Sequence, residues 1–182
     1  IAHVAYFDPL ALPEGMEPGL EAHRAYDPPA MTYSNAAHAC EVLVDVRTGK
    51  VTVERHTVAE DCGRVMNPAI VEGQQHGAIA MGLSGALLEE VIYNDDGQNI
   101  TGSFADYSIA TAVEIPTMRL LHVGVASPAT PTGSKGMSEG GVMGSIGAVT
   151  NAVNDALVPF GVMVEKLPLS PQYLRSLLRG TI

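Results

Sequence analysis

The chain has 182 residues and a formal net charge of −10, from 20 Asp and Glu against 10 Lys and Arg. The sequence has no basic cluster, and such clusters supply most of the affinity for nucleic acid, so a nucleic-acid partner is excluded. Hydrophobic residues make up 46% and charged residues 16%, a composition typical of a globular protein with a core. No apolar run reaches the ~20 residues that a bilayer span needs. Cys40 and Cys62 are too few for an iron–sulfur cluster or a disulfide framework, which predicts a reducing, cytoplasmic location.

Residues 1–36 are predicted to form an irregular N-terminal arm with one short strand. His3 to Phe7 is β-prone, and the segment from Pro9 to Pro29 is rich in Pro, Gly and Glu without periodicity. The chain starts at Ile1, without an initiator Met or a signal peptide. We therefore expect a domain from a longer polypeptide or a processed subunit, with residues 37–182 as its folded part.

A β-hairpin is predicted at the start of that folded part. Ala39–Val46 and Val51–Val58 are β-rich and flank the turn residues 47–50. Three alternating valines share one face of the first strand, and we expect that face to be buried; they are Val42, Val44 and Val46.

The rest of the chain alternates helices and strands. Asn67 and Pro68 are typical of a helix N-cap and first helical position, and helical spacing continues to about Tyr93. The later predicted elements are a strand at Arg119–Ala126, a helix at Gly141–Leu157, a strand at Val162–Lys166 and a short helix at Pro171–Leu178. This order predicts an α+β fold with helices packed on a mainly antiparallel sheet.

The glycine-dense loop Gly133–Gly141 delivers one carboxylate, that of Glu139, to the start of a helix. Glycines let backbone approach a ligand, and a helix N-terminus favours negative charge. Taken alone, the loop is better explained by Glu139 acting as a helix-capping acid. A phosphate loop is disfavoured because Lys135 precedes Gly136, whereas the Walker pattern needs Gly before Lys.

The segment Glu72–Gly77 places amides near the start of the long helix. Gln74 is either exposed or turned toward a polar ligand, because an unpaired buried amide is unfavourable. His76 is predicted to be structural or solvent-facing. No paired-His or Cys-x-x-Cys spacing is present, so no metal site built from protein ligands is predicted.

Several ordered blocks resemble the molybdenum-binding subunit of the xanthine dehydrogenase, aldehyde oxidase and carbon monoxide dehydrogenase family. These blocks are Cys40–Val51, Asp61–Pro68, Val71–Gly82, Glu89-Glu90, Asp106-Tyr107, Glu114–Pro116 and Gly133–Gly141. The resemblance implies that the chain is the C-terminal part of a larger molybdopterin-binding domain. Ser138 stands where the family commonly has glycine.

The resemblance also implies a function and its residues. Glu139 matches the family's general base, and the positions expected at the cofactor are Gln74, Lys135, Gly136 and Ser138. The implied cofactor is molybdenum with molybdopterin, either as such or as its cytosine dinucleotide, with iron–sulfur clusters and FAD on other chains or domains. The remaining part of the molybdenum subunit and iron–sulfur and flavin subunits are the implied partners, so this chain would be half a site. Its substrate would be an aldehyde, an N-heterocycle or a related carbon centre.

Two alternative functions stay open. One is a non-catalytic scaffold, which has no need of Glu139 or Gln74, and the other is a nucleotide-binding module.

Overall fold

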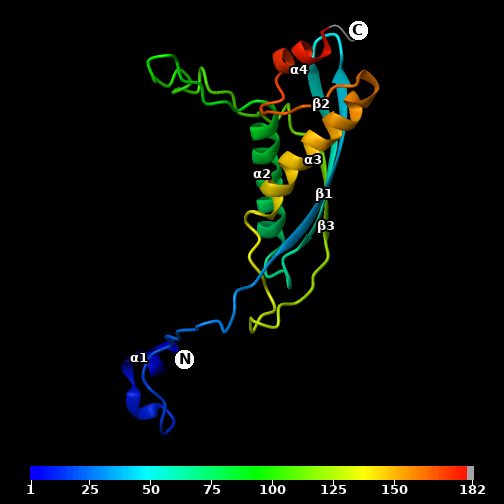
Figure 1. The fold of residues 1–182 in the computed structure, drawn as a ribbon. Helices are drawn as coiled ribbons and strands as arrows, with labels where there is room; N and C mark the ends of the chain where they lie inside the picture. Colours follow the sequence, from blue (N-terminus) through cyan, green and yellow to red (C-terminus); the bar gives the residue numbers. More distant parts are fainter. Residues whose placement is uncertain (180–182) are drawn as a thin grey trace.

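The computed structural model describes residues 1–179, and a three-stranded mixed sheet forms its centre (Figure 1). Strands β1 (Asn35–Asp45) and β2 (Lys50–Asp61) are antiparallel, whereas β2 and β3 (Thr117–His122) are parallel. The connection from β2 to β3 includes a long helix, which returns the chain to the same end of the sheet before β3 starts. The α+β class is confirmed, but the mainly antiparallel sheet is confirmed only in part.

Two long helices cover one face of the sheet and pack against each other. They are α2 (Pro68–Leu87) and α3 (Gly140–Leu157), and a third helix, α4 (Pro171–Leu178), closes the end near the hairpin turn. The fully buried side chains of this core come from all three helices and from β2; they include Val58, Ile79, Leu83, Val149, Val153, Leu157, Leu174 and Leu178. No helix within the described residues is long and apolar enough to cross a membrane.

The predicted hairpin is confirmed, with both strands longer than expected. Its valine face packs on the core, as predicted. The turn packs against α4 at Gly49, which has φ +78°, and a Cβ there would lie closer than 3.0 Å to the Pro171 carbonyl oxygen. Only glycine fits this left-handed position under the helix.

Helix α2 begins as predicted but ends earlier. The Asn67 side chain accepts a hydrogen bond from the Ile70 N–H at 3.3 Å, and Pro68 is the first helical residue. The predicted extension to Tyr93 is wrong because the backbone beyond Leu88 makes its hydrogen bonds to a later segment of the chain and not within a helix. The Ile100 N–H donates to the Ile92 carbonyl at 2.9 Å, and Tyr93 and Asn99 form an antiparallel bridge. Residues 91–101 therefore form a hairpin-like loop instead of another helical turn.

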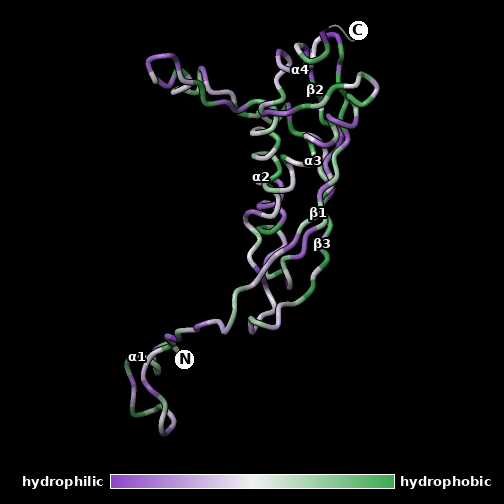
Figure 2. Tube along the Cα trace, in the orientation of Figure 1, coloured by the Kyte–Doolittle hydropathy of each residue, from purple (hydrophilic) through white to green (hydrophobic). Residues whose placement is uncertain are grey.

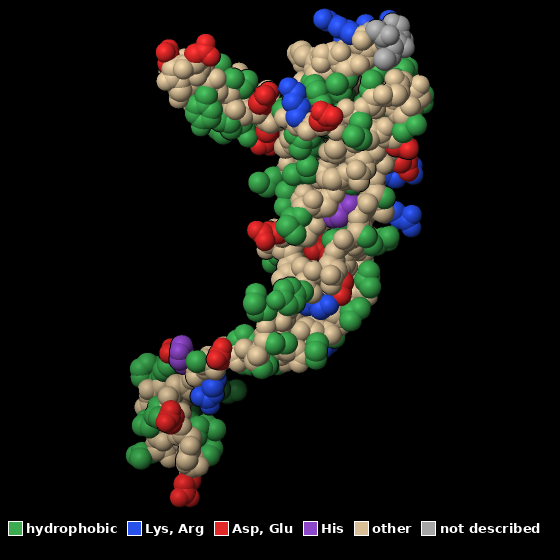
Figure 3. Space-filling view, viewed as in Figure 1, with side chains coloured by type: hydrophobic (Ala, Val, Ile, Leu, Met, Phe, Trp, Pro, Cys, Tyr) green, Lys and Arg blue, Asp and Glu red, His purple; other side chains and the backbone are tan. Residues whose placement is uncertain are grey.

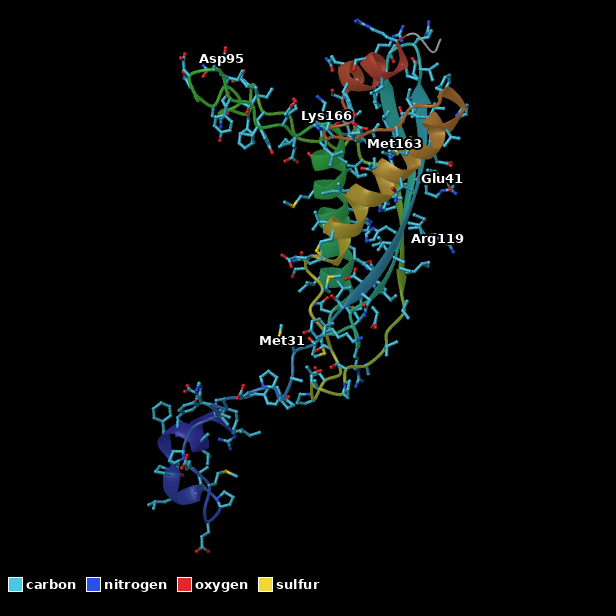
Figure 4. All side chains as sticks on the ribbon, in the orientation of Figure 1. Met31, Glu41, Asp95, Arg119, Met163 and Lys166 are labelled. Atoms are coloured by element: carbon cyan, nitrogen blue, oxygen red, sulfur yellow. The ribbon has the colours of Figure 1, made fainter. Side chains whose placement is uncertain are left out.

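The connection from α2 to β3, residues 88–116, includes an excursion that projects from the body (Figure 1) and returns to α2 at Ala110, whose N–H donates to the Ser84 hydroxyl at 2.9 Å. Asp95 lies at its tip in Figure 4, and Figure 2 shows a hydrophilic tip with hydrophobic residues nearer the body. Several of its apolar side chains are exposed, including Phe104 and Val113.

The N-terminal arm also lies apart from the body (Figure 1). The predicted strand at His3–Phe7 is wrong: helix α1 (Ala2–Phe7) is followed by the 3₁₀ turn η1 (Pro9–Ala11). A strand needs a neighbouring strand to bond its backbone, whereas the helix bonds its own, as in the Ala5 N–H to Ile1 carbonyl bond of 3.0 Å. Hydrophobic side chains cover much of the arm's visible surface in Figure 3. The domain division after residue 36 stays a prediction.

The C-terminal elements match the sequence except at Val162–Lys166. Helices α3 and α4 are confirmed, and the 3₁₀ turn η2 (Val158–Phe160) extends α3. The predicted strand at Val162–Lys166 is wrong because side chains bind its backbone: Asn154 accepts from the Val164 N–H at 2.8 Å, and the Tyr173 hydroxyl accepts from the Glu165 N–H at 2.9 Å. Strand β3 is shorter than predicted and ends at His122.

Candidate active site

The loop that carries Glu139 is anchored at its first end to the segment after β2. The Gly133 carbonyl accepts hydrogen bonds from the N–H groups of Arg64 at 3.0 Å and Ser127 at 2.9 Å, and the Lys135 N–H donates to the Cys62 carbonyl at 2.8 Å. Gly63 has φ +68°, and a Cβ there would lie closer than 3.0 Å to the Gly133 carbonyl oxygen. The backbone of the loop therefore lies directly against the end of β2.

An ion pair strengthens the same anchor. Lys135 Nζ lies 2.6 Å from Asp61 Oδ2, and the two side chains are only 11% and 12% exposed. Asp61 also accepts hydrogen bonds from the N–H groups of Gly63 at 2.9 Å and Val125 at 3.0 Å. The bond from Lys135, followed by the bond from Gly63, lowers the pKa of Asp61. The Lys135 ammonium group is thus held by Asp61, and the predicted cofactor contact of Lys135 stays a prediction.

The second end of the loop enters α3 against a buried polar pair. The Gln75 side chain donates from Nε2 to Glu60 Oε2 at 2.7 Å, and both side chains are fully buried. Glu60 Oε1 lies against Gly140, where a Cβ would approach it closer than 3.0 Å. A Cβ at Gly141 would lie 2.7 Å from the Ala78 Cβ on α2. Glycine at these two positions lets α3 begin in contact with β2 and α2.

Two histidines on the sheet complete this second anchor. His38 Nε2 lies 3.0 Å from the Gly140 carbonyl oxygen, and His38 Nδ1 lies 3.0 Å from His56 Nε2. His56 is fully buried. Burial, and then the neighbouring His38, lowers the pKa of His56 to about 4. His56 is therefore neutral at physiological pH.

Between the two anchors the loop lines a cavity of about 430 Å³. Its wall combines the start of β1, the loop and the first turns of α3; the lining residues are Ser34, Asn35, Ala36, His38, Gly136, Met137, Ser138, Glu139, Gly140, Met143 and Gly144. Three predicted site residues, Gly136, Ser138 and Glu139, are thus brought together at one cavity. A Cβ at Gly136 would meet nothing within 4 Å, so the loop is open on that side.

Glu139 is the N-cap residue of α3, yet its side chain makes no capping hydrogen bond. The side chain is exposed at the cavity. The structure therefore shows no hydrogen-bonded cap at Glu139, and its carboxylate is accessible to a ligand. A stabilising role through the charge of Glu139 at the helix start stays a prediction.

Gln74 lies apart from this cavity. It is exposed on α2 and does not line the cavity, whereas its neighbour Gln75 points inward to Glu60. Its predicted contact with the cofactor stays a prediction.

Sequence reasoning missed the half-buried His38 and the buried polar residues His56, Glu60 and Gln75. A signal for three of them was present, because side chains alternate across a strand. His38 shares the face of Val42 in β1, and His56 and Glu60 share the face of Val58 in β2. Polar side chains on a buried face need specific partners. The partners themselves lie up to 102 residues away.

Comparison with known proteins decides the family. Residues 1–116 match the model of a molybdopterin cofactor-binding domain. The chain belongs to the molybdopterin cofactor-binding family. It is 40% identical over its full length to the nicotine 6-hydroxylase large subunit of Paenarthrobacter nicotinovorans, and 39% identical over 92% of its length to the carbon monoxide dehydrogenase large chain of Hydrogenophaga pseudoflava.

Solved structures of this family share the fold. The quinoline 2-oxidoreductase of Pseudomonas putida 86 superposes with a TM-score of 0.88 at 40% identity, over 97% of this chain and 22% of that one. The reconstituted carbon monoxide dehydrogenase of Oligotropha carboxidovorans gives 0.88 at 34% identity, over 99% and 22%. The chain spans 22% and 20% of the length of the two relatives named above. These relatives are molybdenum-dependent oxidoreductases.

The residues at the cavity fit a molybdopterin cofactor. No group of three or more His, Cys, Asp or Glu is placed to hold a metal ion in the described part of the chain, and a pterin cofactor brings its own sulfur ligands to the metal. The cavity offers backbone, hydroxyl and carboxylate groups instead, with glycines at which the backbone can approach a bulky group. Gly136, Ser138 and Glu139 are the residues that would contact it.

Proposed function

We propose that this chain forms half of the active site of a molybdenum hydroxylase, with Glu139 as its general base. The observation that carries the proposal is the accessible carboxylate of Glu139 at a cavity, on a loop anchored at both ends. The substrate would be an aldehyde, an N-heterocycle or a related carbon centre. Molybdopterin, either as such or as its cytosine dinucleotide, would supply the redox chemistry at that carbon when bound.

Glu139 would accept a proton from the attacking oxygen at its carboxylate. A general base must be ionised before the attack and must be held within hydrogen-bond reach of the proton. The N-terminal end of the 18-residue helix α3 favours a negative charge at Glu139. The two anchors hold the backbone on both sides of Glu139 and leave its carboxylate without a competing capping bond.

The remaining wall of the site would come from the rest of the large subunit. Relatives at 40% and 39% identity are about five times as long as this chain, and its exposed apolar arm and excursion offer surfaces for that part to cover. Iron–sulfur and flavin subunits would carry the electrons away. We expect no turnover from the isolated chain, and a reducing cytoplasm stays the predicted location.

The test is Glu139→Gln in the complete assembly. This change keeps the size of the side chain and removes the proton acceptor. We expect an unchanged molybdenum and pterin content and a single-turnover reduction by substrate that is about 10²–10⁴-fold slower.

Glu165→Gln is the matched control, because Glu165 is an exposed glutamate outside the cavity. It should leave the rate unchanged. Rates of Glu139→Gln within a few-fold of the wild type at equal molybdenum content would remove the catalytic assignment. Absence of molybdenum and pterin from the wild-type assembly would favour the scaffold alternative.

A further inference from the structure

We infer that His38 is a positioning residue that holds the Glu139 carboxylate in place through the Gly140 carbonyl group, with His56 behind it. This inference rests on the proposed function of Glu139. Both histidines lie outside the loop, on β1 and β2, so they tie the start of α3 to the sheet.

The chemistry of the acceptor sets the direction of the hydrogen bonds. A carbonyl oxygen can only accept, so His38 Nε2 carries the proton that is donated to Gly140 at 3.0 Å. In the neutral ring, His38 Nδ1 then accepts the Nε2–H of His56 at 3.0 Å. His56 Nδ1, the remaining nitrogen, has no hydrogen-bond partner among the described residues and needs no proton in this arrangement. The low pKa of His56 agrees with a neutral ring.

Close packing leaves the His38 ring little freedom. A Cβ at Gly144 would lie closer than 3.0 Å to three atoms of the ring, so α3 passes His38 where only glycine fits. The two imidazole rings meet edge to face, with centroids 5.4 Å apart. Each ring is therefore held by a neighbour as well as by hydrogen bonds.

The position of the Gly140 carbonyl affects the position of Glu139 directly. Gly140 follows Glu139 directly and is the first residue of α3. Without His38 the second anchor would retain the packing of Glu60 and Ala78 against the two glycines but would lose the hydrogen bond from the sheet to the Gly140 carbonyl. Only the backbone bonds of α3 itself would then hold that carbonyl. A small displacement at this peptide moves the Glu139 carboxylate relative to the reacting atoms, and misplacement by about 1 Å can lower a rate about 10²-fold.

The experiment compares His38→Leu and His38→Gln in the complete assembly. Leucine fills space but cannot donate, whereas the glutamine side chain can donate to the Gly140 carbonyl from a similar distance. Hydrogen exchange of the peptide covering residues 136–144, molybdenum content and single-turnover rate are measured for each variant. His122→Leu is the matched control, because His122 is an exposed histidine at the end of β3.

We expect His38→Leu to exchange about tenfold faster in this peptide and to react about 10–10²-fold more slowly, with His38→Gln restoring most of both values. The double variant His38→Leu/Glu139→Gln should be no slower than Glu139→Gln alone, because His38 acts through Glu139. Wild-type exchange and rate in His38→Leu, or rate losses that multiply in the double variant, would overturn the inference.

A second variant, His56→Phe, tests the same hydrogen bonds. If His38→Leu fails to fold, His56→Phe keeps a ring in the buried place and removes the donor to His38. It should show the same changes to a smaller degree, and wild-type behaviour would overturn the inference. If Glu139→Gln retains its rate, the proposed function fails, whereas the exchange data still report on the bond between His38 and Gly140.

Discussion

Gln75 and Glu60 form a fully buried hydrogen-bonded pair, with Gln75 Nε2 2.7 Å from Glu60 Oε2. The pair joins α2 to β2 directly beneath the glycine at which α3 begins. The other side-chain oxygen of each residue has no hydrogen-bond partner among the described residues. Each side chain therefore depends on this one hydrogen bond, because removing either partner leaves the other buried without any hydrogen bond.

Gln75→Leu should destabilise the chain more than the double change Gln75→Leu/Glu60→Leu. The single change leaves a buried carboxyl group without its partner, which costs about 1–3 kcal/mol or more, whereas replacing both partners by apolar groups is often nearly neutral. Urea denaturation of the chain and its variants measures the free energy of unfolding. A double variant less stable than Gln75→Leu would contradict the prediction.

Two glycines of α3 should respond in opposite ways to alanine. Gly144→Ala places a Cβ against the His38 ring and should lower the free energy of unfolding by about 1–3 kcal/mol. A Cβ at Gly147 meets nothing within 4 Å, so Gly147→Ala should raise it by up to about 1 kcal/mol through helix propensity. Thermal denaturation of both variants checks the pair. Equal effects would show that His38 does not limit the space at Gly144.

Lys135→Met should lower the melting temperature at neutral pH and raise the pKa of Asp61 toward its usual range. The depressed pKa of Asp61 means that its interactions stabilise the fold at neutral pH and are lost as the pH falls through that pKa. The difference between wild type and variant should therefore shrink below about pH 4. An NMR titration that follows the Asp61 carboxyl carbon measures its pKa, and melting curves at several pH values measure the difference in stability. Lys166→Met, at an exposed lysine over the Tyr173 ring, should leave the pKa of Asp61 unchanged.

His56 should make the chain less stable in mild acid. Its pKa is about 4 in the folded chain against 6.5 for an ordinary histidine, so the unfolded chain binds the extra proton between these values. Stability is complete above about pH 6.5 and falls as the pH drops toward 4, by about 1.4 kcal/mol per pH unit at most. His56→Phe should flatten the dependence of the unfolding free energy on pH in this window. An equally steep dependence in the variant would assign it to other groups.

The elements that local patterns predict are those whose partners are close in sequence. The alternating valines and the turn at Gly49 predict the hairpin, and Asn67 with Pro68 predicts the start of α2. The end of α2 was not predicted because the backbone of Ile92 bonds across the excursion to Ile100 instead of continuing the helix. Helix α1 within the arm was not predicted, because the β-prone segment there has no neighbouring strand to bond its backbone and forms a helix instead.

At the candidate site, sequence alone predicts the loop and its carboxylate but not what holds them. Glu139 was predicted at a helix start and lies there. The Lys135 side chain was expected at the cofactor and is paired with Asp61, 74 residues away. No local sequence pattern indicates this ion pair, because Lys135 and Asp61 come together only when the loop packs against the end of β2 in the folded chain.

The bond between His38 and Gly140 also has a consequence for folding order. It joins residues 102 positions apart, whereas β1 and β2 pair through a short turn. Ordering a long intervening segment costs more entropy than closing a short one, so contacts distant in sequence form late. The hairpin can therefore exist before the Glu139 loop is aligned. We therefore expect alignment of the Glu139 loop to be among the last steps of folding, and a truncated or slowly folding variant to lose it first.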